Sequence, residues 1–165
     1  MITLNEKTKD SFVRIDTKTD GEFFILEYRN NTGFDASIPG HGLMVWRSSE
    51  YMSRYRDNTI NAFHHQQFYP LCANATIRIP TDAPDSYGNL NSASTPFPGT
   101  LGKTSLTDET IPSMRNWNGD PTGLPLTEIV ENVSSGSVSF MIAGGDGQAY
   151  ALSINQVGFY FLTLG

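Results

Sequence analysis

Two apolar, aromatic-rich runs separated by a turn-rich loop dominate the first third of the chain. Glu22–Arg29 is apolar at most positions, and Gly42–Arg47 repeats this character after a loop rich in Asn, Gly and Pro. Aromatic and β-branched residues favour strands, whereas Gly, Pro and Asn favour turns. The pattern therefore predicts two strands joined by the loop at 30–41.

Further strands are expected on both sides of this unit. Residues 12–16 are mostly apolar and are followed by the turn formers Lys18–Gly21, so they should form a hairpin with Glu22–Arg29. The remaining predicted strands are 2–4, 75–79, 125–133 and 137–142, with a turn at 134–136 that joins the last two. Such short strands, with few helical periods, favour an all-β domain.

The stretch from Pro80 to Gly123 is poor in apolar residues and rich in Pro, Gly, Ser, Thr and Asn. A long segment without regular structure is unusual in a compact domain unless function or packing holds it. We expect Trp117 to pin this segment to the core. The fold prediction is therefore an antiparallel β-sandwich, jelly-roll-like, with a long irregular region.

The domain prediction places one β-rich domain at residues 1–145. Residues 146–165 start with a Gly-rich linker and continue into an apolar segment. That segment is expected to add a strand or to begin a following module.

Composition excludes several classes of function. The net charge of −6 argues against a nucleic-acid surface, which needs a basic face. Cys72 is the only cysteine, so neither an intrachain disulfide nor a Cys-rich zinc site is expected, and a small buried side chain is favoured over a reactive thiol. No apolar segment is long enough to span a bilayer. Met1 is not followed by a signal peptide, which leaves a cytosolic protein or a piece of a longer exported one.

Glu27 and Arg29 should share one face of their strand, together with Ile25, because strand side chains alternate. An unpaired carboxylate on an apolar face would be costly. We therefore predict that Glu27 is largely buried and anchors the following loop through Arg29 or backbone N–H groups, a structural role favoured over a catalytic one. Glu22, at the start of the strand, is expected to be solvated. Asp35, Trp46 and His64 complete the predicted structural residues.

Catalytic and metal-binding patterns are weak. The chain has no H-E-x-x-H and no G-x-S-x-G motif, and its three histidines are expected to be structural or superficial. Asp82, Asp85 and Asn89 gather oxygen donors around Gly88, which would permit calcium. The spacing lacks the closing glutamate of a calcium loop, so capping of the loop's own backbone is favoured. Aromatic residues in irregular segments leave a carbohydrate platform open.

The ordered motifs resemble the immune inhibitor A family of secreted zinc metallopeptidases, peptidase family M-six. They are E-F-F-I-L-E-Y-R-N, T-G-F-D-A-S-I-P-G-H-G-L-M-V-W, N-x-x-N-x-x-x-H, T-P-F-P-G, T-x-P-S-M-R-N-W and P-L-T-E-I. The resemblance covers roughly residues 10 to 145 and corresponds to the part downstream of the zinc helix. Two departures are Arg47, where histidine is common, and Tyr28, where asparagine is usual.

The resemblance implies a non-catalytic β-domain of an exported bacterial metallopeptidase. Its partner would be the catalytic part of the same polypeptide, and zinc would be bound only in that part. The alternative is a stand-alone extracellular module that binds carbohydrate or protein. Either function places the chain outside the cell or on its surface.

Overall fold

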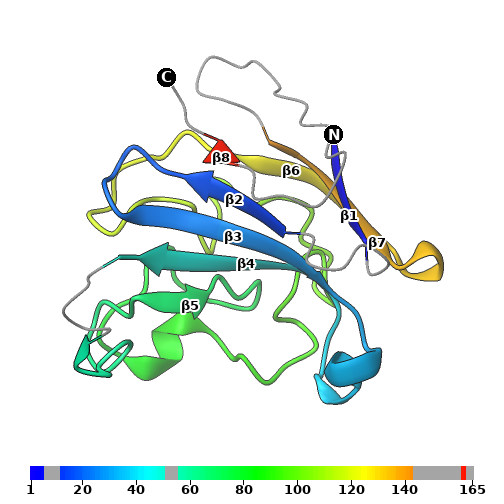
Figure 1. Ribbon diagram of the computed structural model, residues 1–165, viewed down its shortest axis with the longest axis horizontal. Helices are drawn as coiled ribbons and strands as arrows, with labels where there is room; N and C mark the ends of the chain where they lie inside the picture. The colour runs from blue at the N-terminus through cyan, green and yellow to red at the C-terminus, as the bar shows by residue number, and fades with distance from the viewer. Residues whose placement is uncertain (6–11, 51–55, 143–160, 163–165) are drawn as a thin grey trace.

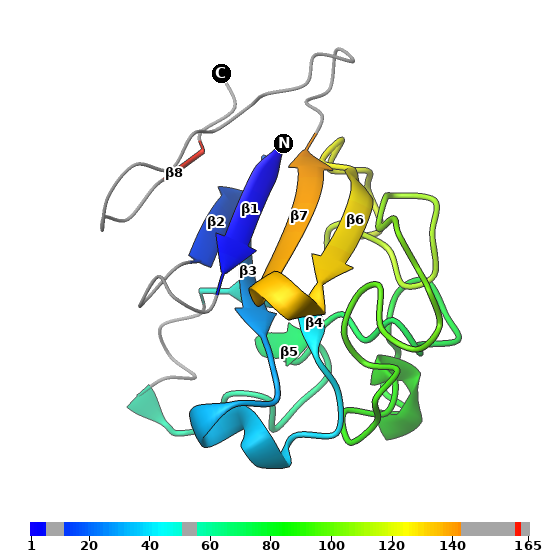
Figure 2. The ribbon, with the colours of Figure 1, turned by 90° about the vertical axis from the view of Figure 1, so that its right-hand side faces the viewer.

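The computed structural model describes residues 1–5, 12–50, 56–142 and 161–162, which form two β-sheets (Figure 1). The smaller sheet has the order β1 (Ile2–Asn5), β7 (Ser137–Ile142), β6 (Leu126–Asn132), and Figure 2 shows these strands side by side in one layer. The larger sheet has the order β5 (Phe68–Pro70), β4 (Gly42–Ser49), β3 (Glu22–Arg29), β2 (Phe12–Asp16), β8 (Phe161–Leu162). All neighbouring strands are antiparallel except β2 and β8. The predicted all-β sandwich is confirmed.

Strand alternation decides which side chains enter the core. On β3, Phe24 and Leu26 are fully buried, whereas Ile25 and Glu27 lie on the opposite, partly exposed face. On β7, all of the even-numbered side chains are buried, as the alternation predicts. The buried side chains of both sheets belong to one hydrophobic cluster. The larger sheet therefore has an inner face against the core and an outer face away from it.

The two predicted hairpins are present. In the first, Phe12 of β2 pairs with Glu27 of β3, and the Glu22 N–H donates to the Thr19 carbonyl at 3.0 Å to close the turn. Gly21 adopts φ 73°, a conformation that glycine adopts more readily than residues with a Cβ. In the second hairpin, η3 (Val133–Ser135) connects β6 to β7. The other 3-10 helices are η1 (Gly33–Ser37) and η2 (Pro84–Tyr87).

The long irregular segment, residues 80–123, contributes side chains to the core and does not simply cover its surface. Phe97, Leu106 and Met114 are each at most 1% exposed. Phe97 exchanges backbone hydrogen bonds with Leu43 of β4 at 2.7 and 2.9 Å, and Leu106 forms a similar bridge with Leu126 of β6. The irregular segment therefore contacts both sheets and contributes large apolar side chains to the core.

One strand prediction was wrong, and one strand was not predicted. Residues 75–79 alternate in sequence but form no strand. The Arg78 carbonyl instead accepts hydrogen bonds from the Ser113 N–H and hydroxyl, each at 3.1 Å, so a loop satisfies the backbone there. Strand β5 forms at 68–70, although apolar and polar residues do not alternate there. Its backbone pairing with β4 decides its extended conformation.

Some predictions fall outside the described residues. Most of the segment predicted at 146–165, including its Gly-rich linker, lies there. Of the predicted terminal segment, only β8 is described, beside β2. Within the described ranges no helix is long and apolar enough to cross a membrane.

Candidate functional site

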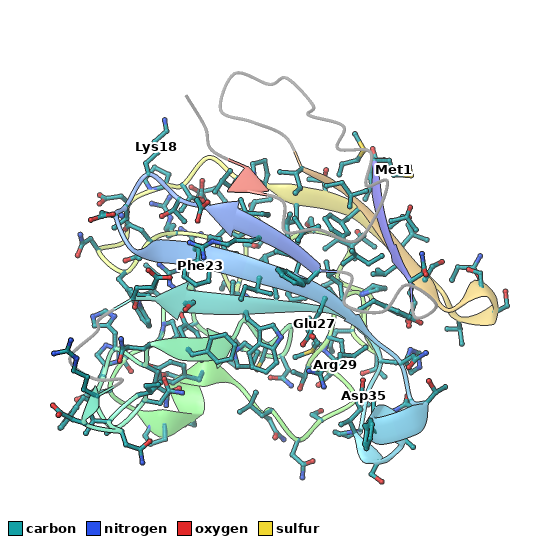
Figure 3. The ribbon with its side chains drawn as sticks, viewed as in Figure 1. Met1, Lys18, Phe23, Glu27, Arg29 and Asp35 are labelled. Carbon is teal, nitrogen blue, oxygen red and sulfur yellow. The ribbon has the colours of Figure 1, made fainter. Side chains whose placement is uncertain are left out.

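A polar cluster lies on the outer face of the larger sheet, where β3 meets the loop that contains η1. Glu27 Oε1 accepts hydrogen bonds from Trp46 Nε1 at 2.6 Å and from Arg29 Nε at 3.0 Å. Arg29 Nη1 also donates to Asp35 Oδ1 at 2.9 Å. Figure 3 shows Glu27, Arg29 and Asp35 following one another from β3 toward η1. Arg29 therefore bridges two carboxylates and ties the loop to the sheet.

The expected burial of Glu27 is wrong. Its side chain is 26% exposed, and those of Arg29 and Asp35 are 35% and 27% exposed. The cause is the face on which the cluster lies, since Ile25 and Glu27 point away from the core. Partial burial acts to lower the pKa of Arg29, but Glu27 and then Asp35 outweigh it, so that this pKa is raised. The pairing with Arg29 is present, but on the surface.

A shallow apolar groove, here called the outer groove, lies beside this cluster. Its cavity volume is about 160 Å³. The floor and walls come from Arg29 at the end of β3, from β4, from the loop after η1 and from the irregular segment. The apolar residues that line it are Ile38, Pro39, Met44, Trp46, Leu90 and Pro96.

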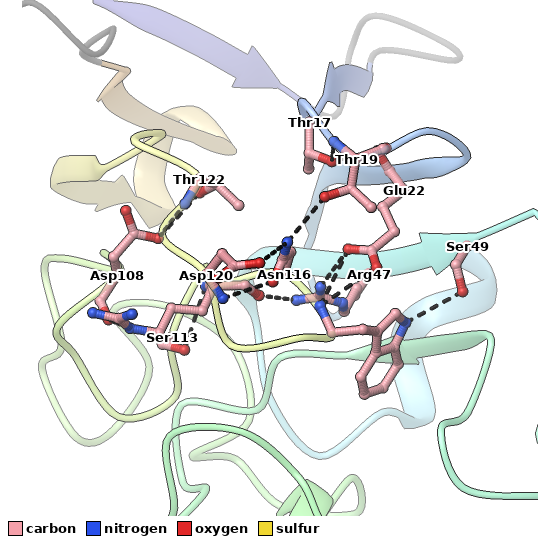
Figure 4. A network of polar contacts seen from close by, with 12 residues as sticks. Thr17, Thr19, Glu22, Arg47, Ser49, Asp108, Ser113, Asn116, Asp120 and Thr122 are labelled. Atoms are coloured by element: carbon pink, nitrogen blue, oxygen red, sulfur yellow. Dashed lines mark hydrogen bonds and ion pairs between the residues drawn. The ribbon is translucent and has the colours of Figure 1, made fainter.

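The buried carboxylate of β3 is Glu22, not Glu27. The side chains of Glu22 and Arg47 are 6% and 4% exposed, and Arg47 Nη2 lies 2.7 Å from Glu22 Oε2. Arg47 also donates through Nη1 to the Arg115 carbonyl. The Trp117 N–H approaches both oxygens of Glu22, at 3.3 and 3.4 Å. Figure 4 shows this network between the strands and the irregular segment.

Trp117 lies at the centre of a largely buried ring cluster. It is 9% exposed, and its Nε1 donates to Ser49 Oγ at 3.2 Å. The Arg47 guanidinium lies 4.7 Å from the Trp117 ring centre, a cation–π distance. His64 contacts the same ring edge-on at 6.2 Å and places Nδ1 3.0 Å from the Tyr87 hydroxyl. These contacts place both residues in one cluster, in which Trp117 is nearly buried and His64 is exposed.

A third polar cluster, which sequence reasoning missed, connects the two sheets. Glu131 of β6 accepts hydrogen bonds from His41 Nδ1 at 2.7 Å and from the Tyr28 hydroxyl at 3.2 Å. The Glu131 side chain is 8% exposed, and that of His41 is 43% exposed. No sequence signal identifies this pair, because 90 positions separate His41 from Glu131.

The candidate calcium residues are spread along a loop that includes η2. Asp85 and Asn89 line an open pocket with Asn74, whereas Asp82 does not line it. Asn89 Oδ1 accepts from the Asn91 N–H at 3.0 Å, and its carbonyl accepts from Asn74 Nδ2 at 2.9 Å. Both oxygens of Asn89 thus accept hydrogen bonds from other residues of the chain. No group of three His, Cys, Asp or Glu residues suited to a metal occurs among the described residues. Calcium binding stays a prediction.

Cys72 is 1% exposed, as expected of a small buried side chain. Burial raises the pKa of its thiol to about 12. Since the thiolate is the reactive form, this environment suppresses nucleophilic chemistry at Cys72.

No protein-family model matches this chain, and no curated protein matches it.

Proposed function

We propose that this chain is a non-catalytic β-rich domain of a secreted zinc metallopeptidase of the immune inhibitor A type. Its role would be to support the zinc-bearing part of the same polypeptide. The proposal begins from the ordered motifs that resemble that family. It gains support from the positions of those motifs in the fold.

The supporting observation is that motifs far apart in sequence meet in one buried network. Glu22 opens the first motif and Trp117 ends the P-S-M-R-N-W motif, whereas Arg47, which directly follows the second motif, is one of the two departures from the family pattern. These three residues are in direct contact through the Glu22 carboxylate and the Arg47 guanidinium. The T-P-F-P-G motif joins them through the bridge between Phe97 and Leu43.

This arrangement suits a scaffold better than a reaction centre. The ion pair of Glu22 and Arg47 is closed off from solvent, and the Arg29 cluster holds a loop. Buried, paired charges fix a local conformation at a cost in desolvation. A domain built in this way presents rigid loops to a neighbouring part.

The test has two arms. The purified chain is incubated with casein and zinc, with and without a chelator, and no chelator-sensitive hydrolysis is expected. The reading frame upstream of the gene segment is then sequenced, and we expect it to encode H-E-x-x-H. Zinc-dependent cleavage by the chain itself, or an upstream frame without that motif, would refute the proposal.

The second candidate is a stand-alone extracellular binding module. The observation that favours it is the aromatic pair on the outer face, where Trp46 and Phe68 stack at 4.9 Å with Phe68 36% exposed. An array of glycans probed with the isolated chain tests the carbohydrate form of this candidate. Selective binding there, together with an upstream frame that lacks H-E-x-x-H, would favour it over the first.

A further inference from the structure

The outer groove has the size of one large apolar side chain. Its cavity volume is about 160 Å³. An apolar cavity of about 150 Å³ is sufficient for a benzene molecule. Leu90, which lines the groove, is 58% exposed, and Met44 and Trp46 are partly exposed. A single Phe, Leu, Ile or Met side chain would therefore fill the groove and cover apolar surface that now faces water.

The polar groups around the groove already have partners within the chain. Arg29 uses Nε, Nη1 and Nη2 on Glu27 and Asp35. Two hydroxyls in the wall are also engaged, since Ser92 Oγ bonds to Ser94 and Thr95 Oγ1 donates to the Asn89 carbonyl. A sugar ring needs hydrogen-bond partners for its many hydroxyls, whereas most residues that line the groove are apolar. These contacts favour an apolar side chain over a glycan.

The charges beside the groove favour one kind of residue next to that apolar side chain. Arg29 lines the groove, and its two partners, Glu27 and Asp35, lie next to it without lining the groove themselves. The three side chains carry a net charge of −1, and both carboxylates are about one-quarter exposed. The whole chain has a net charge of −6. Complementary charge steers association and excludes like-charged partners. A basic residue next to the apolar anchor is therefore favoured, and an acidic one is disfavoured.

Contacts within the chain fix the shape of the groove in the absence of a partner. Phe68 stacks on Trp46 with an interplanar angle of 3°. A Cβ on Gly40 would lie 2.9 Å from the Cα of Ala93, so this part of the wall is in close backbone contact. A pre-formed site avoids the entropy cost of ordering its walls on binding.

We propose that the outer groove binds a polypeptide segment in which a bulky apolar side chain lies beside Lys or Arg. The apolar side chain occupies the space between Leu90 and Trp46, and the basic residue faces Glu27 and Asp35. The inference concerns the groove itself and goes beyond the proposed function, because it holds whichever protein supplies the segment.

The test is a selection of random heptapeptides displayed on phage against the full chain. Enrichment of peptides with Phe, Leu, Ile or Met beside Lys or Arg is expected. Synthetic copies should shift the indole N–H resonance of Trp46 in NMR spectra. Replacing the apolar residue by Ser, or the basic residue by Glu, should weaken binding.

A matched pair of variants keeps the test specific. Leu90→Lys places a bulky cation at the groove, whereas Leu101→Lys changes an equally exposed leucine that does not line it, at 52% exposure. Leu90→Lys should weaken peptide binding about tenfold or more, because burial of one large apolar side chain is lost. Leu101→Lys should leave it unchanged. The proposal would be overturned if both variants bound the peptide equally, or if the selection enriched acidic peptides or no peptides. A shift of the Trp46 resonance with cellohexaose in place of peptides would also overturn it.

Discussion

Glu22 and Arg47 form a buried ion pair across β3 and β4, with Oε2 and Nη2 2.7 Å apart. The Trp117 N–H and the Arg115 carbonyl complete the environment of the pair from the irregular segment. A buried pair of this kind is most sensitive to the loss of one partner, because the other charge is left without compensation. The pair therefore joins the strands to the irregular segment and makes both depend on it.

The first prediction is that Glu22 contributes more to stability than Glu27, which is the opposite of the expectation from the sequence. Glu22→Gln should reduce the free energy of unfolding by about 3–5 kcal/mol, the usual cost of breaking a buried pair. Glu27→Gln, on the same strand but 26% exposed, should cost clearly less. Urea denaturation of both variants measures the difference. A larger loss for Glu27→Gln would show that the outer-face cluster, not Glu22, stabilises β3.

The second prediction concerns the close approach of β4 to the irregular segment. A Cβ on Gly42 would lie 2.5 Å from the Phe97 carbonyl oxygen, and Gly42 has φ 133°. Gly33 also has positive φ, at 57°, but no atom lies within 4 Å of its Cβ position. Gly33→Ala should therefore cost about 1–2 kcal/mol from backbone strain alone, and Gly42→Ala distinctly more. Equal decreases in the thermal midpoint for the two variants would mean that the backbone at Phe97 moves away from a Cβ at position 42 at little cost.

The third prediction concerns the polar link between the two sheets. Glu131→Ala removes the acceptor shared by His41 and the Tyr28 hydroxyl. Loss of a largely buried acceptor should destabilise the fold by about 1–3 kcal/mol. Glu128→Ala on the same strand is the control, since Glu128 is exposed and should change stability by less than about 0.5 kcal/mol. Comparable unfolding curves for the two variants would argue against a stabilising link.

The fourth prediction concerns Cys72, whose thiol pKa is raised from 9.0 to about 12 by burial. At pH 8 the native thiol should react with a disulfide reagent only when the chain unfolds, so labelling should become rapid in denaturant. The unfolded state loses this proton at lower pH than the native state, so Cys72 should reduce stability progressively as pH rises from about 9 to 12. Rapid labelling of the folded chain would contradict the burial of Cys72. Cys72→Ser serves as the unlabelled control.

Local sequence determined the elements that depend on neighbouring residues. Alternation and turn chemistry predicted both hairpins, including the turn that ends at Gly21. The proximity of Glu27 to Arg29 also follows from sequence, because residues two apart on a strand share a face. The all-β class follows from many such short segments together.

Tertiary structure decided which face of β3 is buried and which carboxylate needs a partner. The sequence offered Ile25 and Glu27 on one face and Phe24 and Leu26 on the other, and both faces look apolar. Only the packing of the second sheet and the irregular segment selects the face of Phe24 as the inner one. That selection buries Glu22 beside Arg47 and leaves Glu27 at the surface.

The same limit explains the other differences. The pairing of His41 with Glu131, the position of β5 and the irregular backbone at 75–79 all depend on contacts with residues distant in sequence. Hydrophobic periodicity describes one segment at a time and carries no information about which segments meet. The chain therefore specifies its strands locally, whereas its buried charges and its outer groove arise only when distant segments pack together.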